Sequence, residues 1–380
     1  MLGETHSADR MSGFRFTATP NQERSHMRTS CHRLVGSAAV IAAGLVVSVT
    51  PSTSIGAQAR RRPTTPAAAP DSGLARLEAE MTRLAAIAGG RVGVAAVHLE
   101  TGRQVMLNRG EPFPMASTYK VPIAVQLLSR VDSGSLRLDS MVTIRPSDLH
   151  PGSGTLTQLF DDPGVSLSVR NLLELMLLIS DNSATDITLR TAGGTGPVNA
   201  RLRALGVSGI SVDRPTVQLI ADAIGVKNLP PESELTPQSF NTLARAVSDD
   251  AQKTAAEAFY RDRRDTSTPD GMAKLLETIW RGRALSKANT DLLLDIMRRC
   301  ETGPNRIKGM LPPELIVRHK TGTLGIGVAN DVGIIDLPNG AGHLVLAVFV
   351  KESTRPAEAQ ERAIAQIARA AYDYFLFNPR

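Results

Sequence analysis

The stretch MASTYKVPIAVQLL, residues 115–128, places a lysine at the start of an otherwise apolar segment. Six apolar residues follow that lysine closely: Val121, Ile123, Ala124, Val125, Leu127 and Leu128. They leave little helix surface for water, so the pattern predicts a buried core helix. Two polar residues, Ser117 and Lys120, lie one turn apart at its beginning and call for a chemical explanation.

Ser117 and Lys120 are three positions apart, so a helix puts both side chains on one face. A serine hydroxyl becomes a nucleophile when a base takes its proton, and a lysine serves as that base if apolar surroundings lower its pKa. Pro122 should distort the first turn, because it lacks a donor and crowds a preceding carbonyl. We therefore expect the pair to be close and exposed. Taken alone, the pair fits better a capping serine beside a lysine that extends to solvent.

Two further tripeptides change this balance, namely Ser180-Asp181-Asn182 and Lys320-Thr321-Gly322. The first follows an apolar helix, and the second ends an apolar strand with Thr323 directly after it. Each has an ordinary structural interpretation, as a helix cap or a strand end. All three motifs in this order arise by accident on the order of once in several hundred chains of average composition. The set therefore argues against the ordinary structural interpretation of the serine and the lysine.

Composition favours an ordinary globular protein and excludes several classes of function. The 380 residues are 42% hydrophobic and 21% charged, and the formal net charge of +6 is scattered along the chain. We expect no nucleic-acid partner, because no basic stripe alternates with aromatic residues. The histidines show no metal-ligand spacing, so we expect no metal and no cofactor.

The N-terminal region carries the features of a secretory signal peptide. Arg28 and Arg33 precede an uncharged run over residues 34–49, and Ala57-Gln58-Ala59 offers small residues for cleavage near Ala59. A membrane anchor is the weaker alternative, since the run is shorter than the roughly 20 residues that span a bilayer. Residues 1–59 are thus predicted to be an upstream extension and a signal peptide. The remaining chain would be secreted or periplasmic, without stable membrane insertion.

The rest of the chain is predicted to be a linker and one domain. Residues 60–71, rich in Pro, Ala and Thr, form the linker, and residues 72–380 the catalytic domain. An amphipathic helix is expected near Ser72, followed by a hairpin of two strands, 91–99 and 104–107. Three more strands are expected late in the chain, at 315–320, 328–337 and 343–350, and a last helix at 356–374. The fold class is therefore α/β (α+β). An antiparallel sheet is built from both ends of the chain and flanked by helices, with an all-helical lobe inserted at about 117–285.

The three motifs together resemble the class A β-lactamase family over residues 74–376. The segments HKTGT and ANDVGIIDLPNG are similar to the end of the extended-loop branch of that family. The resemblance implies the β-lactamase/transpeptidase-like fold. It also implies a small substrate, either a β-lactam or a D-Ala-D-Ala-type peptide, and a monomer.

Roles for individual residues follow from the resemblance. Ser117 would be the nucleophile, Lys120 its base, and Ser180 the donor of a proton to the leaving ring nitrogen. Asn182 would hold the side-chain amide of the substrate. The substrate carboxylate would bind at Lys320, Thr321, Gly322 and Thr323. Backbone N–H groups of Ser117 and Thr323 would form the oxyanion hole.

The resemblance fails where the family has a glutamate that activates water. Thr216 stands at that position, and Ile220 replaces a usual asparagine. Arg214 and Asp265 match the pair that closes the neck of this loop, and a long insertion lies between them. The insertion is either a surface helical flap, which we favour, or a lid that supplies another base; the candidates for that base are Glu232, Glu234 and Asp222.

The sequence therefore predicts an exported serine hydrolase of the class A β-lactamase type whose acyl-enzyme on Ser117 is hydrolysed poorly. One alternative is an enzyme like a D,D-peptidase, acting on peptidoglycan. Another is a protein without turnover, either a covalent β-lactam binder or a wall-binding module.

Overall fold

The computed structural model describes residues 72–160 and 164–378, which all belong to one compact unit, Ala67–Arg380. The predicted extension and signal peptide, residues 1–59, and the predicted linker, residues 60–71, lie outside the described residues.

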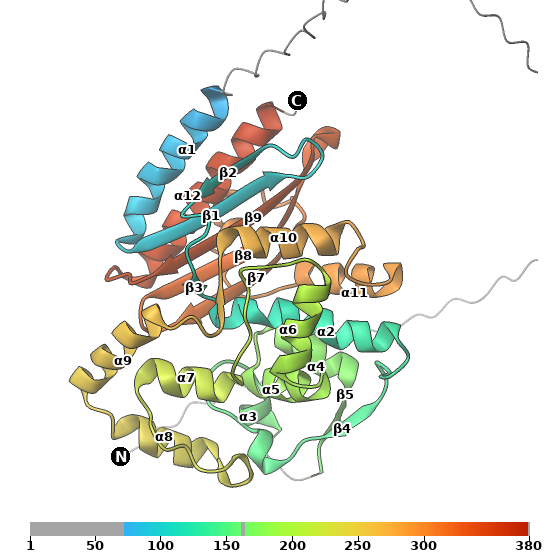
Figure 1. The fold of residues 1–380 in the computed structure, drawn as a ribbon, viewed down its shortest axis with the longest axis vertical. Helices are drawn as coiled ribbons and strands as arrows, with labels where there is room; N and C mark the ends of the chain where they lie inside the picture. The colour runs from blue at the N-terminus through green and yellow to red at the C-terminus, as the bar shows by residue number, and fades with distance from the viewer. Residues whose placement is uncertain (1–71, 161–163, 379–380) are drawn as a thin grey trace, which may run out of the picture. The chain divides into compact units, whose positions relative to one another are not determined.

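A five-stranded antiparallel sheet in the order β2-β1-β9-β8-β7 is built from both ends of the described chain (Figure 1). Its strands are β1 (Arg91–His98), β2 (Gln104–Leu107), β7 (Val317–Leu324), β8 (Val328–Leu337) and β9 (Gly342–Lys351). Two short ribbons pair β3 (Phe113–Pro114) with β6 (Thr266–Ser267) and β4 (Met141–Thr143) with β5 (Ser166–Ser168). The predicted sheet is thus confirmed. However, β7 runs on to Leu324, so the lysine motif lies inside the strand and does not end it.

Alternation along the strands separates two hydrophobic cores. On β9, Leu344, Leu346 and Val348 face one core, while Val345 and Ala347 face the other. The first core is closed by α1 (Ser72–Ala85) and α12 (Ala357–Phe377), which cover the same face of the sheet (Figure 1). The second joins the opposite face to α10 (Pro269–Trp280) and to the helices between the two halves of the sheet. Side chains of a strand point alternately to the two faces, so both faces are buried.

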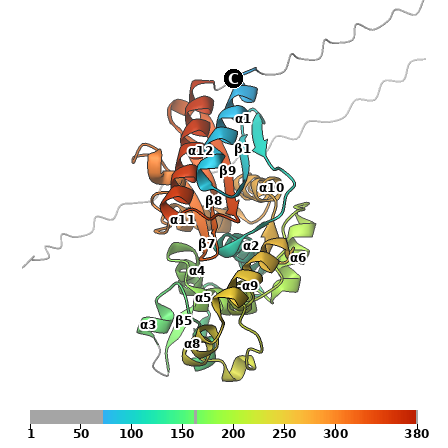
Figure 2. The ribbon, with the colours of Figure 1, turned by 90° about the vertical axis from the view of Figure 1, so that its left-hand side faces the viewer.

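The helices between the two halves of the sheet form a separate layer at one end of it, visible from two directions (Figure 1; Figure 2). They are α2 (Lys120–Asp132), α3 (Leu156–Leu159), α4 (Val169–Leu178), α5 (Asn182–Thr191), α6 (Thr195–Ala204), α7 (Thr216–Ile224), α8 (Pro237–Arg245) and α9 (Asp249–Arg261). After α10, α11 (Lys287–Arg298) contacts β7. Short 3₁₀ turns are η1 (Ala86–Ala88), η2 (Ala116–Tyr119), η3 (Pro146–Asp148), η4 (Glu232–Glu234), η5 (Ile307–Met310) and η6 (Pro338–Gly340).

The two layers meet where η2 packs against β7, which brings the first and last motifs of the sequence together. Gly322 makes this approach possible. A Cβ atom there would lie 2.5 Å from the carbonyl oxygen of Met115 and 3.0 Å from the backbone nitrogen of Ser117. Any larger residue would push β7 away from the serine.

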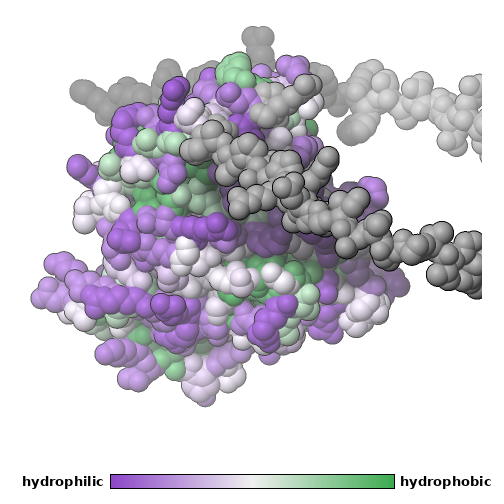
Figure 3. Space-filling view, turned by 45° about the horizontal axis from the view of Figure 1, so that its top comes forward, coloured by the Kyte–Doolittle hydropathy of each residue, from purple (hydrophilic) through white to green (hydrophobic). Residues whose placement is uncertain are grey.

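Apolar side chains are concentrated inside this unit. On the face shown in Figure 3, hydrophilic residues dominate, and most hydrophobic ones lie in recesses between them. Within the described residues, no helix is both long and apolar enough to cross a membrane.

Candidate active site

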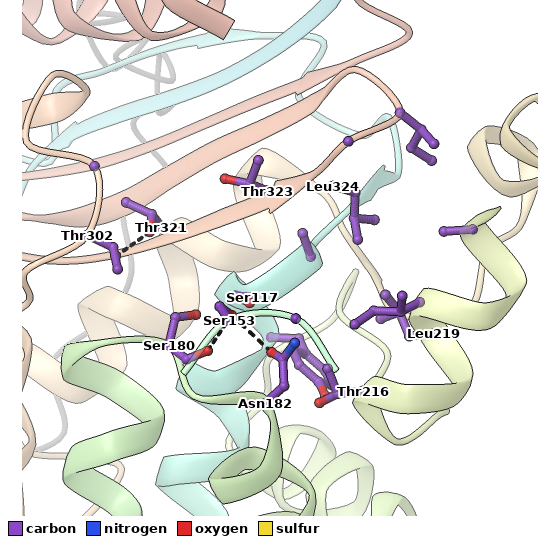
Figure 4. A pocket seen from close by; sticks show the side chains of 18 of the residues that line it. Ser117, Ser153, Ser180, Asn182, Thr216, Leu219, Thr302, Thr321, Thr323 and Leu324 are labelled. Atoms are coloured by element: carbon purple, nitrogen blue, oxygen red, sulfur yellow. Dashed lines mark hydrogen bonds between the residues drawn. The ribbon is translucent and has the colours of Figure 1, made fainter. Parts of the chain in front are cut away.

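Ser117 lies in the tight turn η2, directly before α2, and lines a cavity between the helical layer and β7. The preceding residue, Ala116, has a positive φ of 46°, an unusual conformation for a residue with a side chain. This strained turn keeps Ser117 half-buried with its side chain at the cavity wall (Figure 4). Lys120 is the first residue of α2 and is completely buried, so our expectation that the pair is exposed was wrong for the lysine.

The ammonium group of Lys120 contacts the second motif. Its Nζ lies 2.7 Å from the carbonyl oxygen of Ser180, 3.1 Å from Ser180 Oγ and 3.1 Å from Asn182 Oδ1. Burial lowers the pKa of Lys120 well below its usual range, and the nearby charge of Lys320 lowers it further. The charges of Asp181 and Asp186 oppose this shift in part. Among the described residues, no hydrogen bond joins Ser117 to Lys120, so the two groups share a site but are not bonded.

Ser180 lies between two buried lysines. Its backbone has a positive φ of 63°, and its Oγ is 3.1 Å from Lys120 Nζ and 3.0 Å from Lys320 Nζ. Lys320 also donates to the carbonyl of Thr321 at 2.9 Å, and burial lowers the pKa of Lys320 to about 8. Asp181, which follows Ser180, caps α5 by accepting a hydrogen bond from the backbone N–H of Ala184. The interpretation of the Ser180-Asp181-Asn182 motif as a helix cap is therefore also right.

Two hydroxyls of β7 are held by side chains from the loop before it. Thr321 Oγ1 lies 2.6 Å from Thr302 Oγ1, and Thr323 Oγ1 accepts a 2.7 Å hydrogen bond from Arg306. Arg306 also donates to the carbonyls of Gly322 and Asn330, although it is only 6% exposed. Sequence reasoning missed Arg306, because it lies in an irregular segment outside the three motifs and only the tertiary fold brings it to β7.

These groups surround a cavity of about 340 Å³. Its lining includes Ser117, Ser180, Asn182, Thr321, Thr323, Arg306 and Thr216, so residues from all three motifs converge on it (Figure 4). The lysines lie buried behind this wall. A nucleophile and a set of donors therefore face one small space, with two titratable amines buried directly behind them, which is the arrangement that acyl transfer requires.

Comparisons with known proteins agree with this geometry. The family model described as "Beta-lactamase enzyme family" matches residues 76–375. The chain belongs to the β-lactamase enzyme family. It is 33% identical over 293 residues to β-lactamase VEB-1 of Pseudomonas aeruginosa, covering 75% of this chain and 86% of that protein. It is 29% identical to the extended-spectrum β-lactamase PER-1 of the same organism, and the match covers 75% of this chain and 82% of that protein.

Solved structures place it in class A. An ancestral class A β-lactamase (GNCA) is 31% identical, with a TM-score of 0.63, 78% of this chain covered and 99% of that chain. A β-lactamase from Chitinophaga pinensis is also 31% identical, with a TM-score of 0.65 and coverage of 78% and 98%. The predicted family, the β-lactamase-like fold and a hydrolase of the β-lactamase type are therefore confirmed.

The neck of the loop in this β-lactamase fold is held by one buried guanidinium. Arg214 Nε lies 2.6 Å from Asp265 Oδ2, and its Nη1 lies 2.6 Å from Asp222 and 3.3 Å from Asp262. Asp265 is 1% exposed, and burial raises its pKa although the charge of Arg214 and backbone N–H groups oppose the rise. The predicted pair thus meets in the structure.

Replacing Arg214 by methionine should lower the free energy of unfolding by about 3–5 kcal/mol, because Asp265 would be left buried without a charged partner. Chemical denaturation measures this change. Arg264→Met is the matched control, since Arg264 is exposed and contacts the same Asp222 and Asp262. It should cost about 1 kcal/mol or less. Equal losses in the two variants would contradict a special role for the buried pair.

Thr216 begins α7 and lines the cavity, at the position where the resemblance led us to expect a glutamate. Its backbone N–H donates to Asp186 at 2.6 Å, and its Oγ1 lies 2.5 Å from the hydroxyl of Tyr119. Burial raises the pKa of Tyr119 well above its usual range, and the charge of Asp186 adds to the shift. Both groups are therefore neutral hydroxyls that cannot remove a proton from water near pH 7.

The insertion does not bring a replacement carboxylate to the cavity. Glu232 binds Arg145 and Arg190 at 3.3 and 3.2 Å, Glu234 is exposed, and Asp222 binds Arg214. None of the three lines the cavity, and no other Asp or Glu does so among the described residues. The hypothesis of a lid that supplies a base is thus wrong for this structure. The insertion folds as α8 and α9, packed on α7, which fits the helical flap that we favoured.

Proposed function

We propose that this protein is acylated on Ser117 by β-lactams and that the acyl-enzyme is released slowly. One observation carries the proposal: the groups for acylation lie in and directly behind the cavity wall, while no carboxylate lines the cavity among the described residues. Acylation and release need different bases, so a site can retain the first step and lose the second.

Acylation would use Lys120 and Ser180 to move protons. Neutral Lys120 takes the proton of Ser117, and the serine oxygen forms a bond to the lactam carbonyl carbon. Backbone N–H groups of Ser117 and Thr323 stabilise the negative oxygen that results, and such donors are worth about 3 kcal/mol each. When the C–N bond of the ring breaks, Ser180 gives its proton to the nitrogen. Lys120 then returns a proton to Ser180, whose Oγ lies 3.1 Å from its Nζ.

Substrate would be held at two places around Ser117. Its carboxylate fits Lys320, Thr321 and Thr323, and Arg306 adds a positive charge beside Thr323, to whose hydroxyl it donates a hydrogen bond. Gly322 lets β7 approach closely enough for these contacts. The side-chain amide fits Asn182, whose Oδ1 is oriented by Lys120 at 3.1 Å.

Release of the acyl group would be the slow step. A water molecule near Thr216 would find the hydroxyls of Thr216 and Tyr119, and neither is a base. General-base assistance is typically worth 10² to 10⁴ in rate, which is the loss we expect relative to a site with the glutamate.

Intact mass spectrometry with a chromogenic cephalosporin tests the proposal. We expect a single stable adduct, a burst of colour close to one equivalent and little further turnover. Ser117→Ala should give no adduct. Rapid, sustained turnover would contradict slow release, and absence of an adduct would contradict acylation altogether. Release of D-alanine from a D-Ala-D-Ala peptide, with no stable adduct, would favour the peptidase alternative.

We also propose that the protein acts after export as a monomer, with residues 1–59 removed. Class A relatives and the apolar run at residues 34–49 support this location. Intact mass spectrometry of the protein recovered from the periplasm tests the cleavage. We expect a mass lower than that of the full chain by the mass of residues 1–59.

A further inference from the structure

The cavity beside Ser117 has two ends of opposite chemistry. One end is polar and is formed by Thr302, Thr321, Ser180 and Arg306. The other end is apolar and is formed by Leu219, Ile220, Ala223, Ile224, Leu324 and Ile326. Figure 4 shows Leu219 and Leu324 on the side away from Thr302 and Thr321, with Ser117 between the two ends. We call the six residues of the second end the apolar wall.

The apolar wall is fixed by a small core behind it. Leu219 and Ala223 of α7 are buried against Phe259 of α9, and Leu324 and Ile326 pack on this cluster while remaining half-buried. The hydroxyl of Tyr260 donates to the carbonyl of Ile326, which ties the turn after β7 to α9. The wall is therefore a packed surface that keeps its aliphatic groups towards the cavity.

Charge is confined to the other end. Among the described residues that line the cavity, Arg306 is the one with a charged side chain, and it lies at the polar end. An ionised group placed against the apolar wall would lose water without gaining a partner, which is costly. An aryl or branched alkyl group there would bury apolar surface, which is favourable.

We infer that this site selects β-lactams whose acyl side chain is uncharged and apolar, and rejects those with an ionised side chain. The inference rests on the proposed function, because it concerns the compound that acylates Ser117. The ring carboxylate takes the polar end, so the side chain is directed to the apolar wall. The same argument disfavours cell-wall peptides with charged side chains as substrates.

Electrostatic attraction alone leads to the opposite order of substrates. Lys320 and Arg306 place positive charge at the polar end, although Arg306 also pairs with Glu361 at 3.2 Å, so a second negative charge on the substrate would speed binding. Desolvation at the apolar wall instead penalises an ionised side chain of either sign. A matched series of penicillins separates the two effects.

Benzylpenicillin, carbenicillin and ampicillin share the ring system and the phenyl group, and the last two add a carboxylate or an ammonium beside the phenyl. We expect benzylpenicillin to acylate the full protein fastest, with a second-order rate constant about tenfold or more above both others. Adduct mass against time gives these constants. Equal rates, or carbenicillin fastest, would overturn the inference while leaving acylation of Ser117 intact. No adduct with any of them would remove the proposed function, and the inference with it.

A charge placed on the wall should change this order. Ile326→Lys should bring carbenicillin level with benzylpenicillin or ahead of it, because the new ammonium pairs with the added carboxylate. Ile224→Lys serves the same purpose if the first variant unfolds. Ile316→Lys is the control, since Ile316 is 41% exposed, precedes β7 at its other end and does not line this cavity. A control that shifts the order as much as Ile326→Lys would also overturn the inference.

Discussion

Replacing Thr216 by glutamate is expected to raise the rate of acyl-enzyme release by about 10² to 10⁴, the usual range for a general base. Position 216 starts α7 at the cavity wall, and two backbone N–H groups there are already held by Asp186. A longer side chain at this point can extend into the 340 Å³ cavity beside Ser117. Burial favours the neutral acid and so raises the pKa of such a glutamate, which improves it as a base.

The decisive comparison for this variant is Thr216→Gln, which has the same size and polarity but no basic group. We expect stable adducts in the wild type and in Thr216→Gln, and sustained turnover in Thr216→Glu only. The measurement is steady-state hydrolysis of a chromogenic cephalosporin, combined with the lifetime of the adduct by mass. Equal turnover in the two variants would show that side-chain bulk, and not basicity, limits release.

Tyr119 also affects how well a glutamate at position 216 could assist release of the acyl group. Its hydroxyl lies 2.5 Å from Thr216 Oγ1 and would donate to a glutamate at position 216, stabilising the carboxylate and weakening it as a base. Ile220, which also lines the cavity, is apolar and its side chain offers no hydrogen bond to a water molecule. The slow release that we propose would therefore depend on several side chains around Thr216, and not on Thr216 alone.

The short motifs could be found in the sequence because their chemistry depends on spacing within a few residues. Ser117 and Lys120 are one turn apart, and Lys320 to Thr323 follow one another along a strand, so local geometry brings each set near the cavity. The predicted sheet was also correct, since β1 and β9 are short apolar runs, as is typical of strands buried on both faces, and turn residues separate β8 from β9. The motifs were brought together by the fold as expected.

Features that depend on tertiary packing were not accessible in this way. Pro122 indicated a distorted turn, but not that Lys120 would be completely buried and bonded to Ser180 instead of Ser117. Arg306 reaches Thr323 only because its loop folds back over β7. The acidic residues of the insertion gave no sign that nearby arginines hold them outside the cavity, as Arg190 holds Glu232.

Lys120→Met is expected to lower the rate of acylation by about 10² to 10⁴, because it removes the group that takes the proton of Ser117. Methionine keeps most of the buried volume and carries no charge, so the fold should be retained. Lys287→Met provides a control, as Lys287 lies on the surface of α11 with its side chain 87% exposed. Adduct formation with benzylpenicillin, measured by mass against time, gives the rate.

The pH dependence of acylation separates a base from a merely structural lysine. The pKa of Lys120 lies well below its usual range, so the rate should rise as pH passes through that value and the amine becomes neutral. Lys320, with a pKa of about 8, must stay protonated to bind the carboxylate, so the rate should fall above that pH. The result is a bell-shaped profile in the wild type. Lys120→Met should keep the fall above pH 8 and lose the rise at lower pH; a variant that retains the rise would show that another group is the base.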